Sequence, residues 1–230
     1  AATSSYVYWT DNVQGIVRRS NLKFGDIKTI YKCALRVSCE LGPIAARGTT
    51  AVFTVGEGLF VFREKASEVT PLEGFNTGRL FTVYDIAFLG ESRIFLTSNT
   101  PNYALTTITL DSVDNFEVVY TDTQFYGIAI QEQEFKILFS NNDIESGLIS
   151  GTIVLSDDGK AAQILDTTTK RLEFSTYIAW SITSGVVYVA QKNSVLTSNG
   201  DDDFTDIDRL PGPMAISDSV SVVSRFPSFR

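Results

Sequence analysis

A short motif recurs along this chain at intervals of about 43 residues, and it constrains the fold more than any other feature of the sequence. An apolar residue precedes alanine at five points: Ile44-Ala45, Ile86-Ala87, Ile128-Ala129, Ile178-Ala179 and Met214-Ala215. Successive alanines are 42, 42, 50 and 36 residues apart. A period of this size, sustained over most of the chain, indicates one small structural unit repeated in tandem.

A second short apolar run follows each alanine by about eight residues and ends in a small or polar residue. One further run of this kind opens the chain and ends at Thr10. The others end at Thr54, Thr97, Ser140, Ala190 and Ser224. The runs are about five residues long and are bounded by Gly, Asn, Asp, Ser or Pro, which is typical of strands and turns. Helical periodicity is nearly absent, so the sequence predicts an all-β protein.

The unit itself predicts the architecture. After five of the six second runs comes a hairpin-like segment, so each unit holds four short antiparallel strands, as one blade of a β-propeller does. A sheet this small cannot bury both faces alone, and blades stacked around an axis cover one another. Alanine suits the innermost strand, where blades crowd together. Two β-sandwich domains would also give many short strands, but they do not predict this repeat. We therefore expect a single β-propeller domain over residues 1–230.

The number of blades is ambiguous in the sequence. Five inner strands and five hairpins accompany six second strands, and the stretch from Met214 through the termini to Ile44 spans 60 residues. That stretch is too long for one blade and too short for two. Five blades are preferred, and six are the alternative. In both cases we expect the N-terminal strand, residues 6–10, to pair with a C-terminal strand and close the ring.

A family resemblance rests on one tetrapeptide and its surroundings. Tyr8-Trp9-Thr10-Asp11 is followed by the sequence GIVRR, and a P-x-G-I-A-x-D pattern is echoed around Ile128 and Met214. These segments resemble the YWTD β-propeller repeat of the low-density-lipoprotein receptor. The resemblance implies a six-bladed propeller whose flat faces recognise extracellular ligands. The full tetrapeptide occurs only once in this chain, which is a departure from that family.

Composition excludes several functions. The chain has no histidine, which rules out Ser-His-Asp or Cys-His catalysis and His-ligated zinc. Its 19 Lys and Arg against 27 Asp and Glu give a formal net charge of −8, which argues against nucleic acid and anionic membranes as default partners. No apolar run is long enough to span a bilayer. The start of the chain is compatible with a processed mature terminus, so we expect a secreted, extracellular protein.

Two cysteines and an acidic stretch are candidates for structural chemistry. Cys33 and Cys39 are predicted to form a disulfide, with two separate thiols as the alternative. Asp201, Asp202 and Asp203 could hold Ca²⁺, although they do not match an EF-hand loop and could equally form a solvated turn. No other cofactor is expected.

Candidate ligand-binding residues occur at equivalent turns. Polar residues follow the second strands, an aromatic residue follows an inner-strand alanine, and an arginine lies on an inner strand. Together these residue types are usual in sugar-binding sites. The candidates are Asp11, Asn12, Arg47, Asn99, Asn141, Asn142 and Trp180. The alternative is that the Asn and Asp residues only stabilise turns.

The predicted function is non-enzymatic binding of an extracellular glycan, as in a lectin, or of a protein partner through one propeller face. A glycan-cleaving enzyme is the competing hypothesis, because two suitably spaced carboxylates could cleave a glycosidic bond. Its candidate acids are Asp11, Asp85, Glu91, Glu132 and Asp218. A third hypothesis is a structural subunit that forms a homo-oligomer through a free strand.

Overall fold

A computed structural model describes residues 1–34, 39–72, 82–99, 104–111, 116–121, 125–141, 147–157, 161–170, 177–180, 186–190, 195–198, 205–208, 215–217 and 221–223. These residues form six antiparallel sheets and one 3-10 turn, η2 (Glu132–Glu134). The all-β prediction is therefore confirmed for the described part of the chain.

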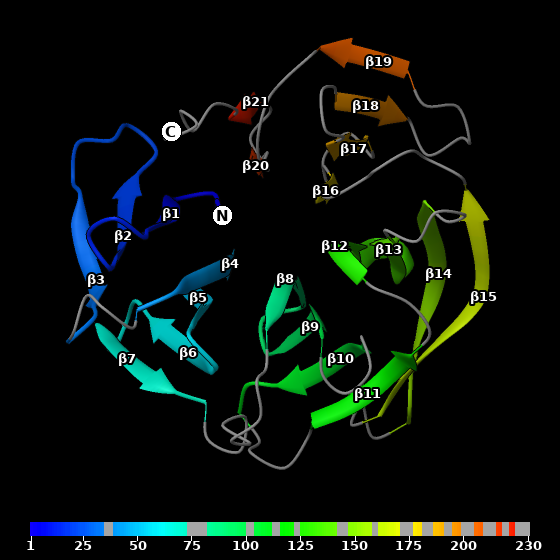
Figure 1. Cartoon of the computed structure of the whole chain (residues 1–230), viewed down its shortest axis with the longest axis horizontal. Coiled ribbons are helices and arrows are strands. Elements are labelled where there is room, and N and C mark those ends of the chain that lie inside the picture. Colours follow the sequence, from blue (N-terminus) through cyan, green and yellow to red (C-terminus); the bar gives the residue numbers. More distant parts are fainter. Residues whose placement is uncertain are drawn as a thin grey trace.

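The sheets follow one another in chain order (Figure 1). The first contains β1 (Tyr6–Asp11), β2 (Ile16–Asn21) and β3 (Lys28–Lys32). The second contains β4 (Leu41–Arg47), β5 (Thr50–Val55), β6 (Gly58–Arg63) and β7 (Glu68–Pro71). The third contains β8 (Val83–Leu89), β9 (Arg93–Ser98), β10 (Ala104–Thr109) and β11 (Phe116–Thr121).

The remaining three sheets complete the arrangement around a common centre. The fourth contains β12 (Phe125–Gln131), β13 (Lys136–Asn141), β14 (Leu148–Leu155) and β15 (Ala162–Lys170). The fifth contains β16 (Tyr177–Trp180), β17 (Val187–Ala190), β18 (Val195–Ser198) and β19 (Thr205–Asp208). The sixth has only β20 (Ala215–Ser217) and β21 (Ser221–Val223).

The hydrophobic core lies between neighbouring sheets. Four clusters of buried side chains each join two consecutive sheets, for example through Tyr8 with Phe53, Val61 with Ile86, Phe95 with Phe139, and Leu138 with Val189. Burial of one such side chain is worth about 1.5–3 kcal/mol, so these clusters hold the sheets to one another. This is the stacking that the repeat predicted.

The repeated alanines lie on the innermost strands, as expected. Strands β4, β8, β12 and β16 surround the centre in Figure 1, and each contacts the next. Ala45 and Ala129 are buried there. Ala45 packs in one cluster with Val83 and Ile86 of β8, and Ala129 in one cluster with Ile178 of β16, so larger side chains there would crowd the neighbouring inner strand.

The polar residues that end the second strands also have a structural reason. The pairing register shifts at equivalent points of three inner strands, between Leu41 and Ile44, Val83 and Asp85, and Phe125 and Ile128. Such irregularities leave backbone N–H and C=O groups without a partner in the hydrogen-bond ladder between the two strands. Ser140 Oγ accepts the Gly127 N–H at 2.8 Å, and Thr97 Oγ1 donates to the Tyr126 carbonyl at 2.8 Å. Small hydroxyl side chains therefore satisfy the inner strand of the same or the next sheet.

The predicted ring closure is not confirmed. Among the described strands, β1 pairs with β2, and its other edge faces Ala2, which bridges Val7. No described C-terminal strand pairs with β1, and β20 pairs with β21. Both blade counts therefore stay predictions.

Cys33 and Cys39 form the predicted disulfide. The Cys33 N–H donates to the Gly15 carbonyl at 2.9 Å, and Gly15 adopts a φ of 65°. A Cβ at Gly15 would lie 3.5 Å from Cys33 Cβ and 3.7 Å from Cys39 Sγ. Glycine thus gives the turn its left-handed backbone and lets the disulfide lie close to it. Separately, none of the helical structure in the described ranges is long and apolar enough to cross a membrane.

Candidate ligand site on the inner strands

The sheet register defines two faces of the molecule. Each inner strand begins beside the end of the second strand, as Val83 opposite Ser98 and Phe125 opposite Asn141 show. We call this edge the start face. Each inner strand ends beside the beginning of the second strand, as Gln131 opposite Lys136 shows, and we call that edge the end face.

The predicted ligand residues divide between the two faces. Asp11, Asn12, Asn99 and Asn141 are at or just beyond the ends of second strands and belong to the start face. Arg47 and Trp180 end inner strands and belong to the end face. Asn142, the acidic triplet Asp201, Asp202 and Asp203, and Asp218 lie outside the described residues.

On the start face, three predicted ligand residues bond to the backbone. Asp11 Oδ1 accepts the Gln14 N–H at 2.9 Å, and Asn99 Oδ1 accepts the Thr82 N–H at 2.8 Å. Asn12 Oδ1 accepts the Leu41 N–H at 2.9 Å, which connects the first sheet to the second. These bonds account for Asn and Asp at the turns. A ligand-binding role for these residues stays a prediction.

Asp85 has the most perturbed carboxyl group on the inner strands. It is the third residue of β8, at the register shift, and it is half-buried. Its Oδ1 accepts the Ile86 N–H at 2.9 Å, and its Oδ2 accepts the Ile128 N–H of the next sheet at 3.0 Å. Burial raises the pKa of Asp85 to about 7, although both backbone hydrogen bonds and the charge of the Ala1 α-amino group act to lower it. Near neutral pH this group can therefore accept or donate a proton.

Two tyrosines occupy equivalent places near the starts of the neighbouring inner strands β8 and β12. Tyr84 precedes Asp85 on β8, and Tyr126 is the second residue of β12. Their ring centroids are 4.8 Å apart with the planes tilted by 38°, and both residues are half-buried. We call Tyr84, Asp85 and Tyr126 the start-face cluster. Neither tyrosine is among the residues predicted from the sequence, although their spacing of 42 residues matches the repeat.

A charged network lies at the end face. Arg47 at the end of β4 forms an ion pair with Glu132 in η2. Glu132 Oε1 also accepts the Gly90 N–H at 2.5 Å. Glu91 is close by, because a Cβ at Gly48 would lie 3.5 Å from its Oε1. The structure thus gathers three residues that the sequence analysis had considered separately, Arg47, Glu91 and Glu132.

Comparison with solved structures shows the fold class. One similar structure is a gluconolactonase, XC5397 from Xanthomonas campestris, with a TM-score of 0.70, 11% identity, and coverage of 91% of this chain and 74% of that chain. Another is a chain of a nidogen/laminin complex, with a TM-score of 0.68, 13% identity, and coverage of 93% and 81%. Both are β-propellers. This chain is a β-propeller.

The similarity supports the propeller class and not the YWTD family in particular. No family model matches the sequence. No curated protein matches it either. At 11% and 13% identity, the two structures show a similarity of fold alone. One of them is an enzyme, and the other is part of a protein complex.

The carboxylates proposed for glycan cleavage are not collected at one point of the propeller. Asp11 and Asp85 lie toward the start face, whereas Glu91 and Glu132 lie at the end face. Glu132 is engaged by Arg47. Among the residues whose placement is known, no group of three or more acidic or Cys side chains could hold a metal ion. The calcium prediction falls on undescribed residues and stays untested.

Proposed function

We propose that this propeller is a non-enzymatic, extracellular, lectin-like protein that binds a glycan at the start-face cluster. The single observation that carries the proposal is the contact between the Tyr84 and Tyr126 rings, next in sequence to Asp85 on β8. Aromatic side chains combine a large apolar face with a polar edge, and a sugar ring has the same two kinds of surface.

The half-buried position of the cluster supports this role. Recognition sites for small molecules combine apolar surface with a few placed polar groups, and the tyrosines and Asp85 supply both. A carboxyl group that is partly protonated at neutral pH can serve as donor or acceptor toward sugar hydroxyls. The end face is less suited to a sugar, because the Arg47–Glu132 ion pair lies there.

A glycan array with the intact chain tests the proposal, with calcium present and absent. We expect Tyr84→Ala and Tyr126→Ala each to weaken binding of a positive glycan by about tenfold, equivalent to about 1.4 kcal/mol. Phe135→Ala is the matched control, because Phe135 is an exposed aromatic residue (44% exposed) just after η2, at the other face. Absence of binding to every sugar, or equal losses in all three variants, would contradict the proposal.

An enzyme is the second candidate, and Asp85 is the observation that favours it. A carboxyl group with a pKa of about 7 is suited to general acid–base catalysis at neutral pH. One similar structure is a gluconolactonase, which makes a sugar lactone the natural trial substrate. Hydrolysis of such a lactone by the wild type, lost in Asp85→Asn with binding retained, would favour the enzyme over the lectin.

The proposal also covers the protein partner, location, calcium and oligomeric state that the sequence predicts. A protein partner is the alternative ligand, since a similar propeller comes from a nidogen/laminin complex. The disulfide supports an oxidising, extracellular location. Calcium at Asp201, Asp202 and Asp203 would appear as calcium-dependent glycan binding. A homo-oligomer would sediment well above the 25.3 kDa of one chain.

A further inference from the structure

The loop between β2 and β3 exposes an unusual amount of apolar surface. Leu22, Phe24 and Ile27 are 39%, 54% and 55% exposed. They are three of the eight large apolar residues that are exposed in the described part of the chain. We call residues 22–28 the Phe24 loop. It lies at the periphery of the first sheet in Figure 1, on the end face, because β2 runs from the start face to the end face.

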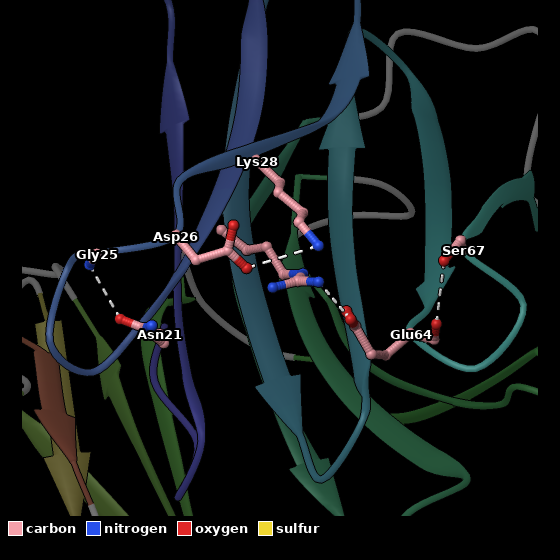
Figure 2. A network of polar contacts seen from close by, with 7 residues as sticks. Asn21, Gly25, Asp26, Lys28, Glu64 and Ser67 are labelled. Carbon is pink, nitrogen blue, oxygen red and sulfur yellow. Dashed lines mark hydrogen bonds and ion pairs between the residues drawn. The ribbon is translucent and has the colours of Figure 1, made fainter.

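Hydrogen bonds hold the Phe24 loop in one shape. Asn21 Oδ1 accepts the N–H groups of Lys23 at 3.1 Å and of Gly25 at 3.0 Å, and the Phe24 N–H donates to the Asn21 carbonyl at 2.9 Å. Figure 2 shows the Asn21–Gly25 bond and the Asp26–Lys28 ion pair at the other end of the loop. A loop ordered before binding loses less conformational entropy when it binds.

The conformation of Phe24 is costly. Its φ is 55°, in the left-handed region that Asn and Gly tolerate and bulky side chains rarely adopt. The strained backbone directs a large aromatic residue into solvent. Local folding alone would be better served by Asn at this position.

The charge around the Phe24 loop is opposite to that of the whole chain. The Phe24 loop contains Lys23 and Lys28 against Asp26, a net charge of +1 in a chain whose formal net charge is −8. Lys23 lies between Leu22 and Phe24, and Lys28 follows Ile27 and forms an exposed ion pair with Asp26. Arg19 is buried in an ion pair with Glu64 and does not contribute to this surface.

We propose that the Phe24 loop docks onto the surface of a lipid bilayer that carries anionic headgroups. Protruding apolar side chains enter the boundary between headgroups and acyl chains, while flanking lysines keep their ammonium groups at the anionic surface. A bilayer needs no preformed pocket to accept Leu22, Phe24 and Ile27 together, whereas a protein partner does. The small contact area and the overall charge of −8 make this binding reversible and sensitive to salt.

Docking through the Phe24 loop is independent of the proposed glycan site. The loop lies on the end face and the start-face cluster on the opposite edge of the inner strands. A propeller docked this way presents Tyr84 and Tyr126 away from the bilayer.

Vesicle co-sedimentation tests the inference directly. The intact chain is mixed with vesicles of phosphatidylcholine alone, or of phosphatidylcholine with phosphatidylserine, at low and high salt. We expect sedimentation with the phosphatidylserine vesicles at low salt and its loss at high salt. Phe24→Asn should weaken this binding by about tenfold, because it removes an apolar anchor. The variant should also fold, since Asn tolerates the left-handed backbone.

Phe135→Asn is the matched control. Phe135 is also exposed (44%) and has a φ of 52°, but it follows Glu132 and Glu134. The same substitution relieves the same strain there and should leave sedimentation unchanged. The inference is overturned if no sedimentation occurs at low salt, or if Phe24→Asn sediments like the wild type. It is also overturned if Phe24→Asn and Phe135→Asn lose sedimentation to the same extent. A Phe24-dependent dimer in analytical ultracentrifugation without vesicles would also overturn it and make a second copy the occupant.

Discussion

Arg47 and Glu132 form an ion pair that joins the second and fourth sheets of the propeller, and the same carboxylate accepts the Gly90 N–H of the sheet between them. Three consecutive blades therefore meet at one side chain. The guanidinium side chain is 31% exposed and the carboxylate side chain 18% exposed, so water screens the pair only in part.

Glu132→Ala should destabilise the propeller by about 1–2 kcal/mol, because Arg47 and the Gly90 N–H both lose their partner. Urea unfolding of the two proteins measures this difference. Glu91→Ala removes an exposed neighbour at the same face and should change the unfolding free energy by less than about 0.5 kcal/mol. If both variants unfold alike, the pair does not hold the blades together.

Asp85 should make the stability of the propeller fall between pH 4 and pH 7. Its pKa is about 7 in the folded state and about 4 in an unfolded chain, so the folded state binds this proton more tightly. The resulting stabilisation is complete below about pH 4 and is lost as the pH rises through about 7. Because Asp85 keeps some solvent contact, we predict the direction of the effect and not its size.

Urea unfolding of the wild type and Asp85→Asn across this pH range isolates the contribution of Asp85. The unfolding free energy of the wild type minus that of the variant should decrease steadily from pH 4 to 7 and level off above that range. Other carboxyl groups act equally in both proteins and cancel. The α-amino group of Ala1, whose pKa burial lowers to about 6 and Asp85 acts to raise, titrates in the same range, so the difference reports Asp85 together with this coupling. A difference that is flat or rises with pH would mean that the pKa of Asp85 is not raised.

Asn12 should act through the backbone and not through a ligand. Asn12→Ala leaves the N–H of buried Leu41 without its acceptor, and we expect a loss of about 1–2 kcal/mol in the free energy of unfolding. Asn12→Asp keeps an acceptor oxygen and should restore most of that loss. Glycan affinity of the folded variants should stay at the wild-type value. An Asn12→Ala protein with normal stability and lost binding would instead assign Asn12 to the ligand site.

Gly42 should not tolerate a side chain. A Cβ there would lie 2.2 Å from Thr54 Oγ1, so Gly42→Ala should destabilise the propeller by about 1–3 kcal/mol. The penalty should shrink when Thr54 is also replaced by Ala, in a double-mutant cycle measured by urea unfolding. Gly25→Ala is the control, since the nearest atom to its added Cβ would be 3.9 Å away. Equal penalties in the presence and absence of the Thr54 hydroxyl would exclude this clash.

Much of the fold was predictable because the repeat is a local pattern. The alanine where inner strands crowd recurs with the period of the blade. Thr97 and Ser140, which lie near the ends of consecutive second strands, both bond to the irregular part of β12. The site was less predictable. Tyr84 and Tyr126 follow the same period, but only the packing of β8 beside β12 shows that their rings meet.

The sequence by itself determined the strand content, the repeating unit and the burial of one apolar set per blade, because each depends on neighbours within about 43 residues. Only the tertiary structure decided which turns share a face. It separated Asn12 and Asn99 from Arg47, and it brought Arg47 to Glu132 across 85 residues. Such partners are chosen by how whole blades stack around the centre, and no local pattern of residues encodes that geometry. For the same reason, an acidic chain can place a basic, apolar loop at one edge.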